Sequence, residues 1–117
     1  MGMSVREILE HGDFEAFSAT LAENIVWVGV LPGQLCRNRE EVLDTFRHAL
    51  SSGIEVSPEI VLEQGDLVVV DPHIQPPLER NPELHHVFVA DGDVIVELRD
   101  FPDRVSALAA VSLAGER

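Results

Sequence analysis

Residues 85–104, HHVFVADGDVIVELRDFPDR, decide how the rest of this chain folds. Apolar residues recur on both sides of Asp91-Gly92, a dipeptide that is typical of hairpin turns. The second arm of the hairpin ends at Asp100, directly before the start of a helix. The stretch therefore predicts a buried β-hairpin that carries one carboxylate to the edge of the core.

The composition predicts a single domain spanning residues 1–117. Hydrophobic residues make up 45% of the chain, but no apolar run approaches the ~20 residues that a membrane-spanning helix needs. The N-terminus has neither the basic flank nor the long apolar block of a secretory signal. We therefore expect a soluble protein of the cytoplasm.

The charge excludes several classes of partner. The chain has 21 acidic residues against 8 basic ones, all of them Arg, for a formal net charge of -13. Such a field repels phosphate groups, so we expect no nucleic acid and no membrane partner. Because the chain lacks both Lys and Tyr, Schiff-base chemistry and a phenolic acid are also excluded.

The pattern of apolar residues predicts four helices and five strands. The elements are expected in this order: helices at 4–11 and 13–21, a strand at 25–30, a helix at 38–53, two strands within 54–71, the hairpin, and a final helix from Pro102. A turn is predicted at residues 64–66, and the four prolines between residues 72 and 82 predict an extended surface loop. The buried helix faces are predicted to contain Val42, Phe46, Ala49 and Leu50, and then Val105, Leu108, Ala109 and Leu113.

This order of elements predicts an α+β fold, with the helices packed on one face of a curved antiparallel sheet. Residues 67–70 are apolar on both faces of their strand. A lone domain would leave one of these faces exposed, so we expect a homodimer that forms through the outer face of the sheet.

The sequence resembles the SnoaL-like branch of the NTF2-like superfamily from Asp13 onward. The resemblance rests on Trp27 after a helix, RNREEV at 37–42, EQGDLVV at 63–69, Asp91-Gly92, and RDFPDR at 99–104. It implies an NTF2-like cone, in which a bent sheet and its helices enclose a cavity, often in a homodimer. It does not imply one reaction, because this superfamily includes isomerases, cyclases, epoxide hydrolases, dehydratases and non-catalytic binding modules.

Strand parity predicts where Asp100 points. Residues 94, 96, 98 and 100 share one face of their strand, and the first three are apolar, so this face is expected to meet the core. A two-residue Asp91-Gly92 loop would put His85 beside Asp100, whereas a three-residue loop would put His86 there. The second register also buries Phe88, which favours His86.

The candidate catalytic residues are therefore Asp100, His86 and His85, acting as general acid and base on an apolar carbonyl compound. The ligand-binding candidates are Trp27, Asp71, Phe88, Val96 and Leu98. The alternative role of Asp100 is structural, either as the cap of the final helix or as the partner of Arg104.

The resemblance also narrows the chemistry. Epoxide-hydrolysing relatives have an Arg two residues before the position of Asp71, where this chain has Val69, and ketosteroid isomerase-like relatives depend on a Tyr. No metal and no cofactor are expected, because the adjacent His85 and His86 point to opposite faces of their strand. Cys36 has no second cysteine to pair with.

Two functions remain open from the sequence. The first is a pocket that binds a small apolar molecule without catalysis. The alternative is an enzyme of the isomerase, lyase or cyclase type that uses Asp100 and one histidine.

Overall fold

The computed structural model describes residues 7–9, 14–30, 33–77, 79 and 82–115, with side chains up to Ser112. The helices are α2 (Phe14–Thr20), α3 (Arg39–Ser51) and α4 (Arg104–Gly115), and residues 7–9 are also helical. The strands are β1 (Leu21–Val28), β2 (Leu35–Cys36), β3 (Glu59–Gln64), β4 (Leu67–Asp71), β5 (His85–Asp91) and β6 (Val94–Phe101). The predicted helix caps at Ser4 and Asp13 lie outside the described residues.

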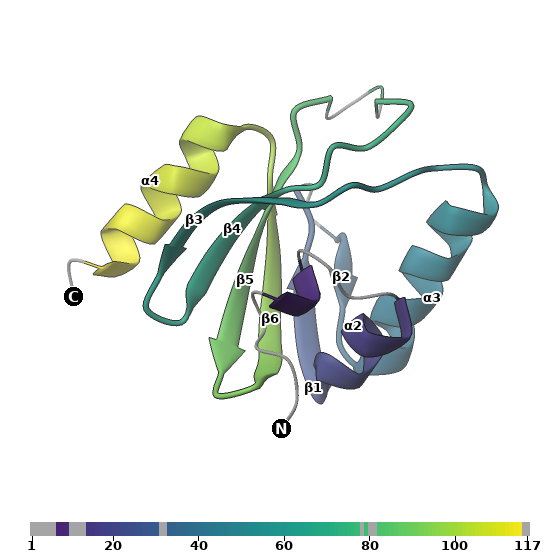
Figure 1. The fold of residues 1–117 in the computed structure, drawn as a ribbon, viewed down its shortest axis with the longest axis horizontal. Helices are drawn as coiled ribbons and strands as arrows, with labels where there is room; N and C mark the ends of the chain where they lie inside the picture. The colour runs from purple at the N-terminus through teal and green to yellow at the C-terminus, as the bar shows by residue number, and fades with distance from the viewer. Residues whose placement is uncertain (1–6, 10–13, 31–32, 78, 80–81, 116–117) are drawn as a thin grey trace.

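The strands form one six-stranded sheet in the order β2-β1-β6-β5-β4-β3, which curves between the helices (Figure 1). β3, β4, β5 and β6 are antiparallel neighbours, which confirms the four antiparallel strands predicted from the sequence. β1 lies parallel to β6, so the complete sheet is mixed, and the short β2 pairs with the other side of β1. The fold is thus the predicted α+β arrangement of helices on a curved sheet.

The sheet has a core on each of its faces. Val68 and Phe88 belong to the core on the face covered by α2 and α3, which we call the α3 face. Val69 and Val87 belong to the core on the opposite face, the α4 face, where they pack with Ala107 of α4. The prediction that all helices lie on one face is therefore wrong, because β4 and β5 are apolar on both sides and both sides require cover.

This second core removes one of the two reasons for expecting a homodimer, namely the apolar outer face of the sheet, and leaves the reason that comes from the family resemblance. Val69 is fully buried and Val87 is 4% exposed within the single chain. α4 contacts β3, β4, β5 and β6, so it covers the apolar surface that a second copy was expected to cover.

The hairpin differs from its predicted form by one bulge. Asp91 pairs with Val94, but the register shifts between the pair Ala90–Ile95 and the pair Val89–Glu97, which leaves Val96 as the extra residue of β6. The predicted core face of β6 is therefore wrong before the bulge: Val94 is 37% exposed and Ile95 is fully buried. After the bulge, the face that includes Leu98 turns inward as predicted.

α3 begins where the sequence predicts. Asn38 is its N-cap, and its side-chain oxygen accepts a hydrogen bond from the Glu41 amide at 2.9 Å. Val42 is fully buried and Phe46 packs against the core as a partly buried residue. Leu50, in the last turn of α3, was expected to be buried but is 45% exposed.

α4 packs through a face that includes Leu108, as predicted, but otherwise differs from the predicted one. Ala107 and Val111 are buried, whereas Val105 is 78% exposed and Ala109 is also exposed. Because α4 is apolar on nearly every side, its sequence has no distinct stripe that could reveal the packed face. The side chain of Leu113 lies outside the described residues. α4 is nevertheless too short to cross a bilayer, and no other helix in the described ranges is long and apolar enough to do so.

Candidate functional site

Trp27, His86 and Asp100 form a chain of hydrogen bonds on the α3 face. The indole Nε1 of Trp27 donates to Asp100 Oδ1 at 2.8 Å, and His86 Nδ1 lies 2.7 Å from the same oxygen. The side chain of Asp100 is only 11% exposed and that of His86 is 8% exposed. A carboxylate this well buried needs close hydrogen-bond donors, and both neighbours supply one.

Strand register brings these three residues together. β1 runs parallel to β6 with Trp27 paired to Leu98, so the indole can reach Asp100 two residues further along. In the hairpin, His86 pairs directly with Asp100. The structure therefore places His86, and not His85, beside Asp100. This register depends on the bulge at Val96. The bulge shifts the pairing by one residue and so puts His86 beside Asp100, an effect that the sequence analysis expected from a three-residue loop.

Asp100 has neither of the alternative structural roles. The cap of α4 is Asp103, whose Oδ1 accepts a hydrogen bond from the Ser106 amide at 2.7 Å. Arg104 lies beside Asp71 and His85 instead. Asp100 is thus free to orient His86.

The hydrogen bonds to Asp100 define the tautomer of His86. An ionised carboxylate only accepts hydrogen bonds, so His86 Nδ1 carries the hydrogen and the lone pair of the neutral ring is on Nε2. Among the described residues Nε2 has no hydrogen-bond partner. His86 also lines a cavity on this face, where Nε2 can accept a hydrogen bond from a bound molecule.

The space beside His86 is a cavity of about 220 Å³, which we call the aromatic pocket. It is lined by Ile8, Leu9, Phe14, Phe17, Phe46, Leu50, Val56, Pro58, Val70, Pro72, His86 and Phe88. His86 is the one polar side chain among the described residues of this lining. A mostly apolar cavity with one placed polar group is the usual form of a small-molecule site.

Aromatic side chains shape this pocket. Phe17 meets Phe46 edge to face at 5.2 Å between ring centroids, and Phe88 meets the His86 ring at 5.9 Å. Behind the pocket, Trp27 stacks on Phe46 with ring centroids 4.9 Å apart. The rings therefore fix both the pocket wall and the hydrogen-bond chain that ends at His86.

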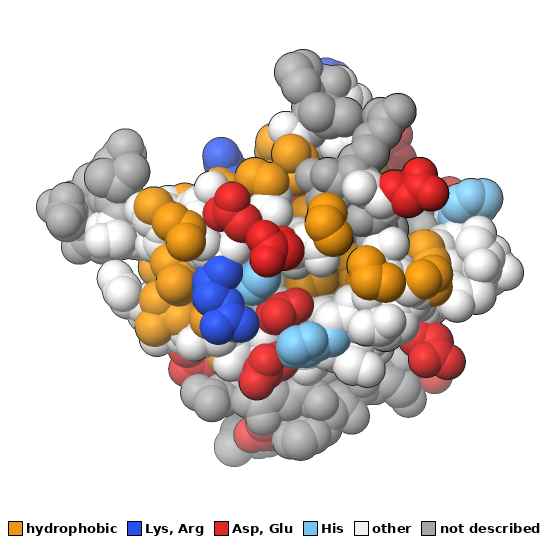
Figure 2. All heavy atoms as spheres, turned by 90° about the horizontal axis from the view of Figure 1, so that it is seen from above, with side chains coloured by type: hydrophobic (Ala, Val, Ile, Leu, Met, Phe, Trp, Pro, Cys, Tyr) orange, Lys and Arg blue, Asp and Glu red, His pale blue; other side chains and the backbone are white. Residues whose placement is uncertain are grey.

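A second cavity, of about 450 Å³, opens between the start of α4 and the proline-rich loop. We call it the polar pocket; its lining is Asp71, Pro72, His73, Ile74, Gln75, Pro77, Pro82, Glu83, Leu84, His85, Asp103, Arg104 and Val105. Figure 2 shows acidic, histidine and arginine side chains gathered on the face of the molecule seen from above. This pocket differs from the aromatic pocket in being lined by many charges.

His85 is held inside the polar pocket. Its Nδ1 lies 2.6 Å from the carbonyl oxygen of Glu83, and its Nε2 accepts a 3.4 Å hydrogen bond from Arg104 Nε. Asp71 Oδ2 lies 3.8 Å from His85 Nε2 and 3.6 Å from the Arg104 guanidinium. The hydrogen bond from the Ser106 amide lowers the pKa of the nearby Asp103 carboxyl.

The predicted catalytic residues thus divide between two pockets. Asp100 and His86 belong together beside the aromatic pocket, whereas His85 lies in the polar pocket with the predicted ligand-binding residue Asp71. Phe88 lines the aromatic pocket.

The other three predicted ligand-binding residues do not line the aromatic pocket. Leu98 is fully buried in the core and so supports the site from behind. Val96 is the bulge residue. Trp27 is partly buried and lines a separate hollow of about 250 Å³ together with Asp100, Cys36 and Thr45, so Asp100 faces a cavity with Trp27 as predicted, but not the aromatic pocket.

Sequence reasoning missed most of the aromatic pocket wall. Phe17 and Phe46 were marked as inward-facing by helical periodicity, but that signal does not distinguish a pocket wall from packed core. The sequence also has no local signal for three residues at or near the polar pocket. Asp103 and Arg104 reach it at the start of α4, and Glu59 lies nearby in β3.

Comparisons with known proteins agree with this architecture. A protein of unknown function from Cytophaga hutchinsonii with an NTF2-like fold superposes with a TM-score of 0.61 at 16% identity, covering 82% of this chain and 90% of that one. A candidate polyketide cyclase from Sinorhizobium meliloti gives a TM-score of 0.62 at 18% identity, covering 81% and 87%. A Catenulispora acidiphila protein with a ketosteroid isomerase-like fold, solved with trimethylamine, gives 0.57 at 18% identity, covering 88% and 85%.

No curated protein matches the chain. At these identities the similar structures show the fold alone. The family model for the SnoaL-like domain matches residues 4–96, which include the helices of the α3 face and most of the sheet. The chain therefore belongs to the SnoaL-like domain family and has the NTF2-like fold that its sequence resembles.

Proposed function

We propose that this protein binds a small, largely apolar molecule in the aromatic pocket and holds it through one hydrogen bond to His86 Nε2. The observation that carries the proposal is the lining of the pocket, in which His86 is the single polar side chain among the residues that the structure describes. Because Nδ1 donates to Asp100, the neutral ring accepts at Nε2. The matching ligand therefore has an apolar body and one hydroxyl or similar donor.

The pocket favours an uncharged ligand. The charge of Asp100 already has two hydrogen-bond donors, and apart from His86 no ionisable side chain among the described residues lines the aromatic pocket. A charged ligand would lose its hydration without meeting an opposite charge, which costs several kcal/mol or more. Binding by apolar contact with the phenylalanine rings has no such cost.

Trp27 supplies a direct test, because it is the only tryptophan in the chain and stacks on the pocket residue Phe46. Titration with α-tetralol, which has a bicyclic apolar body and one hydroxyl, should change the Trp27 fluorescence and saturate. His86→Phe keeps a flat ring but removes the acceptor. It should weaken tetralol binding about tenfold while leaving binding of tetralin, the parent hydrocarbon, nearly unchanged.

The matched control is His48→Phe, since His48 is exposed in the last turn of α3. This variant should bind both compounds as the unchanged protein does. Equal weakening of tetralol and tetralin in His86→Phe would contradict the proposed hydrogen bond, and no saturable signal with either compound would contradict the pocket.

A second candidate function is general base catalysis, favoured by the chain Trp27–Asp100–His86. In this reaction His86 Nε2 would take a proton from a carbon next to a carbonyl, and Asp100 would stabilise the resulting imidazolium. Return of the proton to another carbon would isomerise the compound, and attack of the carbanion on a second carbonyl would close a ring. Similarity in fold to a candidate polyketide cyclase is consistent with this chemistry.

Deuterium exchange separates the two candidates without knowledge of the natural substrate. If His86 acts as a base, the protein in heavy water should exchange the hydrogens next to the carbonyl of α-tetralone faster than buffer does. His86→Phe should abolish the acceleration, and Asp100→Asn should reduce it at least tenfold because the imidazolium loses its partner. An exchange rate equal to that of buffer would leave binding as the function.

The homodimer and the cytoplasmic location stay predictions.

A further inference from the structure

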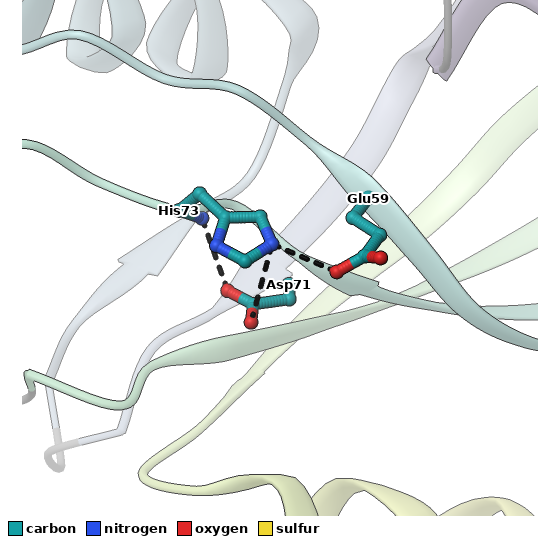
Figure 3. A group of neighbouring side chains, drawn as sticks. All are labelled: Glu59, Asp71 and His73. Atoms are coloured by element: carbon teal, nitrogen blue, oxygen red, sulfur yellow. Dashed lines mark hydrogen bonds and ion pairs between the residues drawn. The ribbon is translucent and has the colours of Figure 1, made fainter.

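A second group of side chains, Glu59, Asp71 and His73, lies at the rim of the polar pocket (Figure 3). His73 Nε2 is 2.8 Å from Glu59 Oε1 and 3.6 Å from Asp71 Oδ2. One ligand atom from each residue lies within 4.8 Å of the other two. These separations resemble those between ligand atoms that share one metal ion at about 2.0–2.2 Å.

The backbone explains how these residues meet. Glu59 of β3 pairs directly with Asp71 of β4, so two carboxylates face each other across antiparallel strands. Like charges in this position repel, and a cation between them would relieve the repulsion. His73 has a left-handed backbone, with φ at 46°, and its amide donates to Asp71 Oδ1 at 3.0 Å. This turn folds the imidazole back toward both carboxylates, as Figure 3 shows.

We propose that Glu59, Asp71 and His73 bind a divalent transition-metal ion such as Zn²⁺. Two carboxylate oxygens would suit many divalent cations, but an imidazole nitrogen favours zinc and its transition-metal neighbours over Mg²⁺ and Ca²⁺. Glu59 and His73 have side chains 61% and 48% exposed, so the ion would keep open positions toward solvent and the polar pocket. Such an open site is distinct from the aromatic pocket and from His86.

The buried His85 is placed to support this site. Its side chain is 6% exposed, and its Nε2 lies 3.8 Å from the ligand oxygen of Asp71. Its Nδ1 lies 2.6 Å from the Glu83 carbonyl, which can only accept, so the lone pair of the neutral ring is on Nε2. Histidines that bind metals commonly donate their other nitrogen to a carbonyl in this way. Once an ion occupies the site, His85 Nε2 would serve as its fourth ligand.

Arg104 is the competitor of the ion. Its guanidinium lies 3.6 Å from Asp71 Oδ2 and donates to His85 Nε2. A divalent ion beside Asp71 would meet this positive charge. Removing it should therefore tighten metal binding, an effect that a merely structural cluster would not show.

The test is calorimetric titration of the full chain, freed of metals with a chelator, with ZnCl₂. We expect saturable binding of one ion per chain. His73→Asn should weaken binding more than tenfold; asparagine tolerates a left-handed backbone, so the turn is kept. Glu59→Gln should also weaken binding more than tenfold. Because Glu59 is exposed, this variant should fold and keeps the test valid even if His73→Asn does not fold. His48→Ala, which removes an exposed histidine elsewhere, should leave affinity unchanged.

Arg104→Gln completes the set and should tighten Zn²⁺ binding several-fold. Absence of saturable binding up to about 1 mM Zn²⁺, the weak limit of useful affinity, would overturn the proposal. So would binding that is equally strong in His73→Asn and Glu59→Gln, because the ion would then be held elsewhere on an acidic surface. The circular dichroism spectrum of each variant confirms that it is folded.

Discussion

His85 and His86 are neighbours in β5, yet they lie in pockets on opposite faces of one sheet. His86 meets a cavity whose other described lining residues are all apolar, and its one charged neighbour, Asp100, is enclosed by two hydrogen-bond donors. His85 meets a cavity lined by carboxylates, a second histidine and an arginine, several of them exposed. The two imidazoles therefore experience different surroundings although their backbones are adjacent.

The difference shows how burial selects ligand chemistry. On the α3 face the charge is paired within the protein, which leaves one neutral acceptor and favours an uncharged, apolar ligand. On the α4 face the charges remain open to solvent, and the opposed Glu59 and Asp71 favour a cation. One pair of strands thus carries residues of both proposed sites, because successive side chains alternate between faces.

The largest effect is expected from Phe88, which faces the aromatic pocket and is 3% exposed. Phe88→Ala should lower the free energy of unfolding by about 3–5 kcal/mol through lost burial and a new cavity. Urea denaturation measures this loss. Under native conditions Phe88→Ala should still bind Zn²⁺. If the variant lost both Zn²⁺ binding and tetralol binding, the two pockets would not be independent.

A smaller effect is expected at Asp100. Asp100→Asn should lower the free energy of unfolding by about 1.5–3 kcal/mol, because the charge-assisted hydrogen bonds from Trp27 and His86 are lost. The same urea measurement applies, with Asp66→Asn in an exposed turn as the matched control. A change as small as that of the control would show that Asp100 is not held as the structure indicates.

On the polar side, Asp103 should make stability depend on pH. Its hydrogen bond from Ser106 lowers the pKa of the carboxyl in the folded protein, so its stabilising effect is present above the ordinary aspartate pKa of about 3.9 and is lost as the pH falls through the lower, folded value. The melting temperature of the unchanged protein should exceed that of Asp103→Asn near neutral pH, and the gap should close in acid. A gap that stays constant with pH would contradict this.

The smallest effect is expected at Val105, which is 78% exposed at the rim of the polar pocket. Val105→Ala should change the free energy of unfolding by no more than about 0.5 kcal/mol. A loss well above 1 kcal/mol in urea would mean that another surface covers Val105, and light scattering would then show whether a second copy does so.

The sequence predicts elements better than faces in this protein. The cap at Asn38 and the turn at residues 64–66 follow from local chemistry, and both are present. The side of helix α4 that packs on the sheet was mispredicted, except for Leu108. The helix is apolar on nearly all sides, so helical periodicity cannot identify the packed side. The face of Val94 was mispredicted because a bulge adds one residue without a clear mark in the sequence.

The candidate site was predicted only in part, for a related reason. Parity after the bulge correctly turned Asp100 inward, and the burial of Phe88 favoured the histidine that does lie beside it. The indole partner could not be predicted as such, because Trp27 reaches Asp100 through a parallel pairing of strands far apart in the chain. Long-range register of this kind decides the site and has no local signature.

Nitrogen NMR of histidine-labelled protein tests the central claim most directly, since it observes the ring nitrogens on both faces at once. On saturation with α-tetralol, the Nε2 resonance of His86 should shift as it accepts a hydrogen bond, while those of His85 and His73 should stay in place. A shift of His85 or His73 with His86 unchanged would contradict the account, because it would place the ligand in the polar pocket on the other face of the sheet.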